Sequence, residues 1–172
     1  LSIVIAFSIA TLVFIPMLTS TAAPIKSYLS YTLPVVGAGW IIALTGLIDD
    51  VKELSAKKKM IGILLAASLV WFLTDFRLND FKIPFGGPLL HFEPWLSYLL
   101  TVIWIVSITN AVNLIDGLDG LVSGVSIISL VTMGIVSYFF LPVPNLFLTM
   151  TIFVLVASIA GFFPFNYHPA IL

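Results

Sequence analysis

Six long apolar runs constrain this chain more than any other feature. They cover residues 1–18, 31–48, 60–74, 95–109, 121–141 and 146–163. A helix needs about 20 residues to cross a bilayer, or about 17 at the short end. The first, fifth and sixth runs are that long, whereas the second, third and fourth must borrow flanking residues. Because the runs are too long and too uniformly apolar for barrel strands, the sequence predicts six spans, mostly helical.

The composition agrees with a membrane protein. Of the 172 residues, 60% are hydrophobic and only 9% are charged, whereas a soluble domain carries about 25% charge. We therefore expect an all-α, polytopic transmembrane bundle forming one integral-membrane domain over 1–172. The net charge of −1 gives no reason to expect a nucleic-acid partner, and the absence of cysteine excludes disulfides and thiol chemistry. Since the chain starts and stops inside its apolar pattern, we interpret it as a fragment of a longer protein.

Six spans sort the connecting segments onto two sides of the membrane. One side receives 19–30, 75–94 and 142–145, and the other receives 49–59, 110–120 and 164–172. All the polar residues that could support chemistry fall on the second side. The same side carries the cluster Lys57-Lys58-Lys59, which by the positive-inside rule places it in the cytoplasm.

The segment 75–94 on the opposite side predicts a β-hairpin. Two short apolar stretches flank Gly86-Gly87, which is a hairpin signal. Pro84 and Pro88 limit the pairing, so the hairpin should be short and exposed. It would be extracytoplasmic.

The stretch 110–120, at the mouth of a predicted span, is the strongest functional signal. It places Asn or Asp at every third position, and a glycine follows each aspartate; the polar residues are Asn110, Asn113, Asp116 and Asp119. Carboxylates at a membrane boundary are costly and usually functional. On a continuous helix the four side chains would share roughly one face. Their oxygens suit a hard cation such as Mg²⁺, with substrate phosphate as a further ligand. A helix-capping loop is the alternative, but it explains only one or two of the four.

Other polar residues lie on the same predicted side. Asp49 and Asp50 close the second apolar run. Neighbours on a helix diverge by about 100°, so we expect a division of labour between them rather than joint chelation of one ion. A solvated helix end is the alternative, with Lys57–Lys59 as a membrane-surface anchor. Asn166 follows the sixth run and could reach the same site, whereas we expect an interfacial position for His168.

Three motifs in this order resemble one enzyme family. They are Asp49-Asp50, Asn-x-x-Asn-x-x-Asp-Gly-x-Asp-Gly-Leu at 110–121, and Asn166-x-x-Pro-Ala170. The sequence resembles the polyprenyl-phosphate N-acetylhexosamine-1-phosphate transferases, which start teichoic-acid and O-antigen synthesis or make lipid I. Leu54-Ser-Ala-Lys57 and Pro84-Phe-Gly-Gly87 look most like the teichoic-acid branch, which uses UDP-N-acetylglucosamine.

The resemblance implies a reaction and its cofactor. Undecaprenyl phosphate would attack the β-phosphorus of the UDP-sugar, UMP would leave, and Mg²⁺, or alternatively Mn²⁺, would offset the charge. Asp49 would act as a base or phosphate-positioning group with Asp50 beside it. A phosphate monoester is already mostly dianionic at pH 7, because its second pKa lies near 6, so positioning should matter more than proton removal.

The resemblance also assigns binding roles. The metal would be held by Asn113 and Asp116, and the substrates by Asn110, Asp116, Asp119 and Asn166, with Asp119 on the uracil. The location would be the bacterial cytoplasmic membrane, with a homodimer left open. The alternatives are a lipid I-forming transferase and, from another class, a membrane transporter or a non-catalytic scaffold. Against a transporter, the carboxylates cluster at span ends rather than at mid-span.

The departures from the family pattern carry an expectation of their own. The family continues with Phe-Met-Gly-Asp, whose aspartate binds magnesium, whereas this chain stops at Leu172. A later His-rich loop and an earlier basic Gly-Gly loop are also missing, and Ile63 stands where Gln is usual. We therefore expect the 172-residue chain alone to bind nucleotide weakly and not to turn over.

Overall fold

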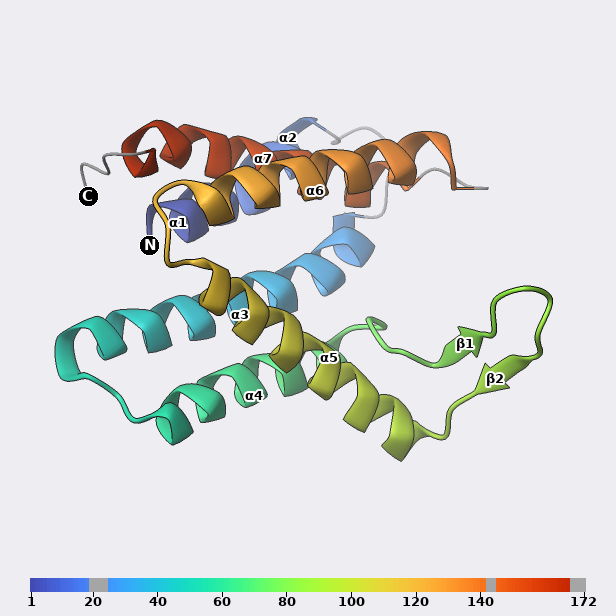
Figure 1. The fold of residues 1–172 in the computed structure, drawn as a ribbon. Helices are drawn as coiled ribbons and strands as arrows, with labels where there is room; N and C mark the ends of the chain where they lie inside the picture. Colours follow the sequence, from blue (N-terminus) through green and yellow to red (C-terminus); the bar gives the residue numbers. More distant parts are fainter. Residues whose placement is uncertain (19–24, 142–144, 168–172) are drawn as a thin grey trace. The chain divides into compact units, whose positions relative to one another are not determined.

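The chain is almost entirely helical in a computed structural model that describes residues 1–18, 25–141 and 145–167. The elements in order are α1 (Ser2–Ile9), the π-helical η1 (Ala10–Phe14), α2 (Ile15–Leu18), α3 (Ile25–Lys52), α4 (Ala56–Leu73), β1 (Asp80–Lys82), β2 (Leu89–His91), α5 (Pro94–Ile115), α6 (Leu121–Phe139) and α7 (Leu146–Asn166) (Figure 1). The predicted all-α class with one small hairpin is confirmed.

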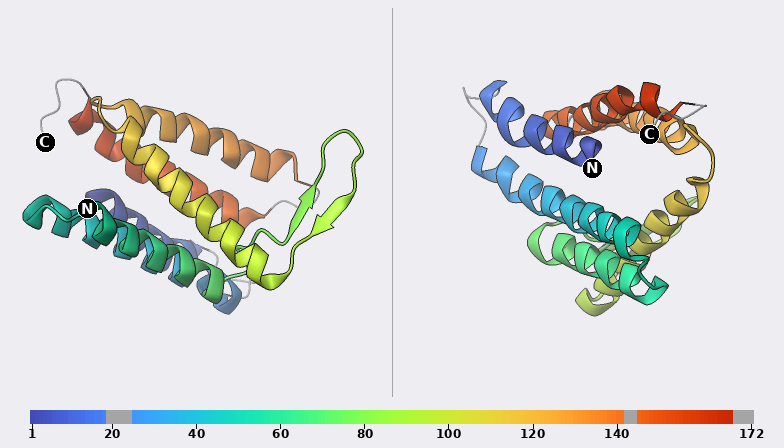
Figure 2. Two further views of the ribbon diagram at one scale, coloured as in Figure 1. Left: turned by 60° about the horizontal axis from the view of Figure 1, so that its bottom comes forward. Right: turned by 90° about the vertical axis from the view of Figure 1, so that its left-hand side faces the viewer.

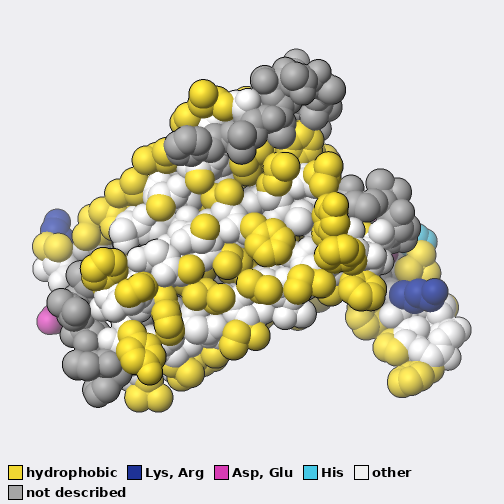
Figure 3. Space-filling view, turned by 90° about the horizontal axis from the view of Figure 1, so that it is seen from above, with side chains coloured by type: hydrophobic (Ala, Val, Ile, Leu, Met, Phe, Trp, Pro, Cys, Tyr) yellow, Lys and Arg dark blue, Asp and Glu magenta, His cyan; other side chains and the backbone are white. Residues whose placement is uncertain are grey.

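Four of the described helical segments are long and apolar enough to cross a membrane. They are Tyr28–Lys52, Pro94–Ile115, Leu121–Phe139 and Leu146–Asn166. In the most apolar 18-residue stretch of each helix, only 11–22% of the residues are buried. Hydrophobic side chains are spread over the face shown in Figure 3. Such exposure is unfavourable in water and suits lipid. The chain is a polytopic membrane protein. The first and third predicted spans stay predictions, because Ser2–Met17 is shorter and α4 begins with three lysines among its first four residues.

The second and fourth predicted spans do borrow flanking residues. α3 extends the run 31–48 in both directions, and α5 extends 95–109 to Ile115. Helical hydrogen bonding depends on the backbone and not on hydropathy, so polar residues at the membrane boundary stay helical. This is why Asp49, Asp50, Asn110 and Asn113 are helical residues.

The structure divides into two compact units, 1–32 with 112–172 and 33–111. In the first unit, α6 and α7 pack antiparallel, and α1 lies against α7. Buried Ser137 and Thr149 join α6 to α7 through their hydroxyls at 3.0 Å. Gly134 allows a close approach, since a Cβ there would lie 2.9 Å from Cε2 of the Phe153 ring.

In the second unit, α3 and α4 meet where Gly62 faces Thr45. A Cβ on Gly62 would lie only 2.8 Å from the Thr45 methyl carbon, and closer still to its hydroxyl oxygen. α4 and α5 are joined by the Ser68 and Tyr98 hydroxyls at 2.9 Å. The Trp71 ring meets Tyr98 edge to face, with ring centroids 5.2 Å apart.

The hairpin between α4 and α5 forms where the sequence predicts it (Figure 2). β1 and β2 pair antiparallel, with Phe81 opposite Leu90, and all six strand residues are exposed. Phe85 and Gly86 adopt positive φ angles of 63° and 86° at the turn. The predicted short, exposed hairpin is confirmed.

Candidate functional site

The carboxyl end of α3 is closed by a left-handed residue. α3 ends at Lys52, and Glu53 follows with φ of 45°. The Glu53 backbone N–H donates to the Asp49 carbonyl at 2.8 Å. This is the bond of an αL helix ending, in which glycine is the usual left-handed residue. The ending turns the chain from α3 into α4.

The Asp49 carboxylate takes part in this turn. One oxygen, Oδ1, accepts a hydrogen bond from the Leu54 backbone N–H at 2.9 Å. The other, Oδ2, lies 2.5 Å from the Lys59 ammonium in the first turn of α4. The Asp49 side chain is 23% exposed and that of Lys59 is 48% exposed. Both oxygens of Asp49 therefore hold the α3–α4 connection.

Asp50 has different surroundings. It is exposed, and none of the residues that the structure describes hydrogen-bonds or ion-pairs with its carboxylate. Its helical position turns it about 100° away from Asp49. The solvated-helix-end alternative accounts for Asp50 but not for Asp49. The surface-anchor interpretation of the three lysines is incomplete, because Lys59 is an internal partner of Asp49.

The 110–120 stretch is part helix and part turn. Asn110, half-buried, and Asn113, exposed, lie on the last turns of α5, whereas Asp116 and Asp119 are exposed in the turn before α6. Because α5 ends at Ile115, a shared helical face applies only to Asn110 and Asn113. Gly120 adopts φ of 75°, a left-handed angle that glycine tolerates and that breaks the helical path. Gly120 is also the N-cap of α6, so the helix start does not use an Asn or Asp at the capping position.

The end of α7 comes to the end of this turn. The Asn166 side-chain Nδ2 donates to the Ser123 hydroxyl, in the first turn of α6, at 3.0 Å. A Cβ on Gly120 would lie 3.4 Å from the Asn166 carbonyl oxygen and 3.5 Å from the Phe163 ring. Asn166 is thus fixed beside the motif's final residue. His168 and the Pro169-Ala170 part of its motif lie outside the described residues.

The candidate residues fall into the two compact units. Asn113, Asp116, Asp119 and Asn166 belong to the first unit, and Asp49, Asp50 and Asn110 to the second. The structure brings Asn166 to the turn that contains Asp119. It also brings Lys59 to Asp49. Their functional roles stay predictions.

Asn113 and Asp116 have the donor chemistry that magnesium prefers. Among residues 1–18, 25–141 and 145–167, no three Asp, Glu or His side chains gather closely enough to hold a metal by themselves. Magnesium, however, commonly takes one or two protein carboxylates and completes its shell with water and phosphate oxygens. Asn113 and Asp116 offer an amide oxygen and a carboxylate three residues apart, and both are exposed. They fit such a partial ligand set.

The sequence interpretation missed two supporting residues. Lys59 is ten residues from Asp49 in the sequence, and the two meet across a connection that contains the left-handed Glu53. Ser123 is an ordinary small residue in a helical run, 43 positions from Asn166. A lysine in the helix turn following an acidic helix end could have signalled the first pairing. No local sequence pattern predicts the contact between Asn166 and Ser123.

Two comparisons relate the chain to known proteins. Residues 32–172 match the family described as Glycosyl transferase family 4. The chain is 39% identical over 136 residues to a Bacillus subtilis (strain 168) protein named probable undecaprenyl-phosphate N-acetylglucosaminyl 1-phosphate transferase. The match covers 78% of this chain and 36% of that relative, so the chain spans little more than a third of the relative's length. No solved structure matches the chain significantly.

Proposed function

This chain belongs to glycosyl transferase family 4, and we propose that it contributes to the transfer of N-acetylglucosamine 1-phosphate from UDP-N-acetylglucosamine to undecaprenyl phosphate. The observation that carries the proposal is the extent of the family match. It runs from 32 to 172 and includes all the candidate residues, from Asp49 and Asp50 to Asn166. The name of the Bacillus subtilis relative supports the lipid acceptor and the sugar.

The proposed step is a single phosphoryl exchange. An oxygen of the lipid phosphate forms a bond to the β-phosphorus of the nucleotide sugar. The bond from that phosphorus to the bridging oxygen breaks, and UMP leaves with its electron pair. The product is undecaprenyl diphosphate carrying N-acetylglucosamine. Because such reactions need little covalent assistance, the protein contributes mainly positioning and charge stabilisation.

The first unit supplies most of the polar groups for the nucleotide. In the proposal, Asp119 contacts the uracil, and Asn113 and Asp116 hold magnesium. When bound, magnesium offsets the negative charge of the diphosphate and of the departing phosphate. Asn166, tied to Ser123 at 3.0 Å, orients its amide beside the same turn. Asn110, which belongs to the second unit, contributes a further amide for substrate.

The second unit also supplies Asp49 and Asp50. The charge on a dianionic acceptor phosphate makes proton removal unnecessary at neutral pH. The role that remains for an aspartate is to orient the acceptor and any bound cation. The sugar donor, the cytoplasmic position of the site and the bacterial plasma membrane belong to the same proposal, as does a role in teichoic-acid or other cell-envelope synthesis.

The donor is tested by direct comparison in membranes. The complete gene product is placed in liposomes with undecaprenyl phosphate and Mg²⁺, and UMP release is measured with UDP-N-acetylglucosamine or with the UDP-muramoyl-pentapeptide donor. We expect release with the first donor only. Release with the second donor alone would favour the lipid I-forming alternative, and no release with either would reject the proposal. Asn113→Ala should raise the Mg²⁺ concentration needed for half-maximal rate, with Thr132→Ala, an exposed position eleven residues into α6, as the control.

A further inference from the structure

We propose that the two adjacent aspartates have separate tasks: Asp49 is a positioning residue that clamps the α3–α4 connection through Lys59, and Asp50 is the carboxylate presented to substrate. This inference rests on the proposed function for the chemical part. The clamp itself is independent of it. Adjacent acids in a membrane transferase invite the interpretation that both act on the phosphates together. The side-chain partners assign them differently.

The first observation is that both oxygens of Asp49 are already committed. Oδ1 accepts the Leu54 backbone N–H at 2.9 Å, and Oδ2 meets the Lys59 ammonium at 2.5 Å. A carboxylate that turned toward a phosphate would leave Lys59 and the Leu54 N–H without this acceptor.

The second observation is that the clamp holds a connection with little support of its own. Glu53 sits at φ of 45°, a conformation that a non-glycine residue adopts at a cost. The Ser55 N-cap of α4 makes no side-chain capping hydrogen bond. The two contacts of Asp49 therefore tie the last turn of α3 to the first turn of α4 across a connection that lacks a capping side chain.

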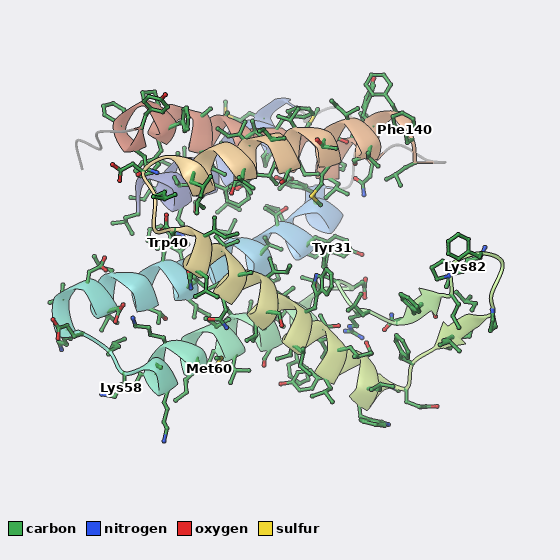
Figure 4. The ribbon with its side chains drawn as sticks, viewed as in Figure 1. Tyr31, Trp40, Lys58, Met60, Lys82 and Phe140 are labelled. Atoms are coloured by element: carbon green, nitrogen blue, oxygen red, sulfur yellow. The ribbon has the colours of Figure 1, made fainter. Side chains whose placement is uncertain are left out.

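The third observation is the state of Asp50. It lies one residue further along the same helix turn and is exposed, and neither of its carboxylate oxygens has a partner in the part of the chain that the structure describes. Its backbone is fixed by the helix and by the clamp that starts at Asp49. A rigid backbone with an accessible carboxylate is the arrangement that positioning of a cation or a phosphate group requires. Figure 4 shows the α3–α4 connection, with Lys58 and Met60 labelled at the start of α4.

The activity test compares three variants in the complete gene product. Asp50→Asn should lower kcat by about 100-fold or more, as the loss of a group that stabilises the transition state does. Asp49→Asn keeps an acceptor for the Leu54 N–H but loses the ion pair, and Lys59→Gln loses it from the other side. Because an exposed ion pair contributes little, each should lower turnover by only about two- to fivefold. Their double variant should be no worse than the poorer single variant. Lys58→Gln is the matched control and should change nothing.

A second readout keeps the clamp testable without activity. Hydrogen exchange of the peptide covering 50–59, measured in detergent, reports protection of the Leu54 amide. Asp49→Ala should raise this exchange, because alanine offers no acceptor for the Leu54 N–H. Asp50→Ala should leave the exchange unchanged. If the wild-type protein releases no UMP, the proposed function fails while this measurement still decides the clamp.

The outcomes that overturn the inference are specific. If Asp49→Asn lowered kcat as much as Asp50→Asn while Lys59→Gln left kcat unchanged, Asp49 would act on substrate directly. Equal exchange in Asp49→Ala and wild type would show that Asp49 does not hold the connection.

Discussion

The contact between α3 and α4 predicts that Gly62→Ala destabilises the protein, although alanine is the better helix former. A Cβ at this position would lie 2.8 Å from the Thr45 methyl carbon and 3.1 Å from its Cβ. Thr45 cannot easily move away, because a β-branched side chain has few rotamers. Its hydroxyl also donates to the Ile41 carbonyl at 2.7 Å.

The expected size follows from two opposing effects. Overpacking costs about 1–3 kcal/mol, and replacing glycine by alanine within a helix returns about 0.5–1 kcal/mol. The net loss should therefore be about 1 kcal/mol, within a range of about 0–2.5 kcal/mol, because the cost of overpacking exceeds the gain in helix propensity.

The assay is unfolding of the purified chain in mixed detergent, followed by circular dichroism. Gly46→Ala is the matched control, since it lies in the interior of α3 and a Cβ added there would meet no neighbouring side chain or helix within 4 Å; it should stabilise by about 0.5–1 kcal/mol. Adding Thr45→Ala to Gly62→Ala should recover part of the loss, because it removes the Thr45 methyl and hydroxyl groups but keeps the Cβ at 3.1 Å. If Gly62→Ala were as stabilising as Gly46→Ala, the close packing of α3 on α4 would be wrong.

Three further predictions concern topology, packing and the nucleotide site. Cysteine at Ala56 should react with an impermeant reagent only from the cytoplasm and cysteine at the fully exposed Phe85 only from outside; labelling of both from one side would overturn the six-span topology. Thr149→Val should cost about 1–3 kcal/mol in detergent unfolding, because it strands the buried Ser137 hydroxyl that now lies 3.0 Å from the Thr149 hydroxyl, and adding Ser137→Ala should recover part of this; equal stability of the single variant and wild type would contradict the contact. Asp119→Asn should raise KM for the UDP-sugar in the complete gene product more than it lowers kcat, and an unchanged KM would remove Asp119 from the nucleotide site.

The elements that burial in lipid dictates could be predicted from sequence. Apolar length located the four long spans, and Gly86-Gly87 between short apolar stretches located the hairpin, because both signals act within a few residues. Helix ends were predicted less well. α3 and α5 continue through acids and amides because backbone hydrogen bonds do not stop where hydropathy falls.

The candidate site could be predicted as a set of residues but not as an arrangement. The three-residue repeat identified Asn113 and Asp116, yet only the structure shows that the helix ends between them, with Gly120 in the left-handed region. The contact of Asp49 with Lys59 depends on Glu53 adopting a positive φ angle, which no propensity favours for glutamate. Contacts made across a turn or between distant helices depend on the folded chain and leave no local signal in the sequence.

The most direct test of the proposed reaction follows the phosphorus atom. The complete gene product is incubated in liposomes with undecaprenyl phosphate, Mg²⁺ and UDP-N-acetylglucosamine labelled at the β-phosphorus and in the sugar. The proposal predicts that both labels enter the lipid in a one-to-one ratio, while the uridine leaves as UMP. Transfer of the sugar label without the phosphorus label, or no labelled lipid at all, would contradict it.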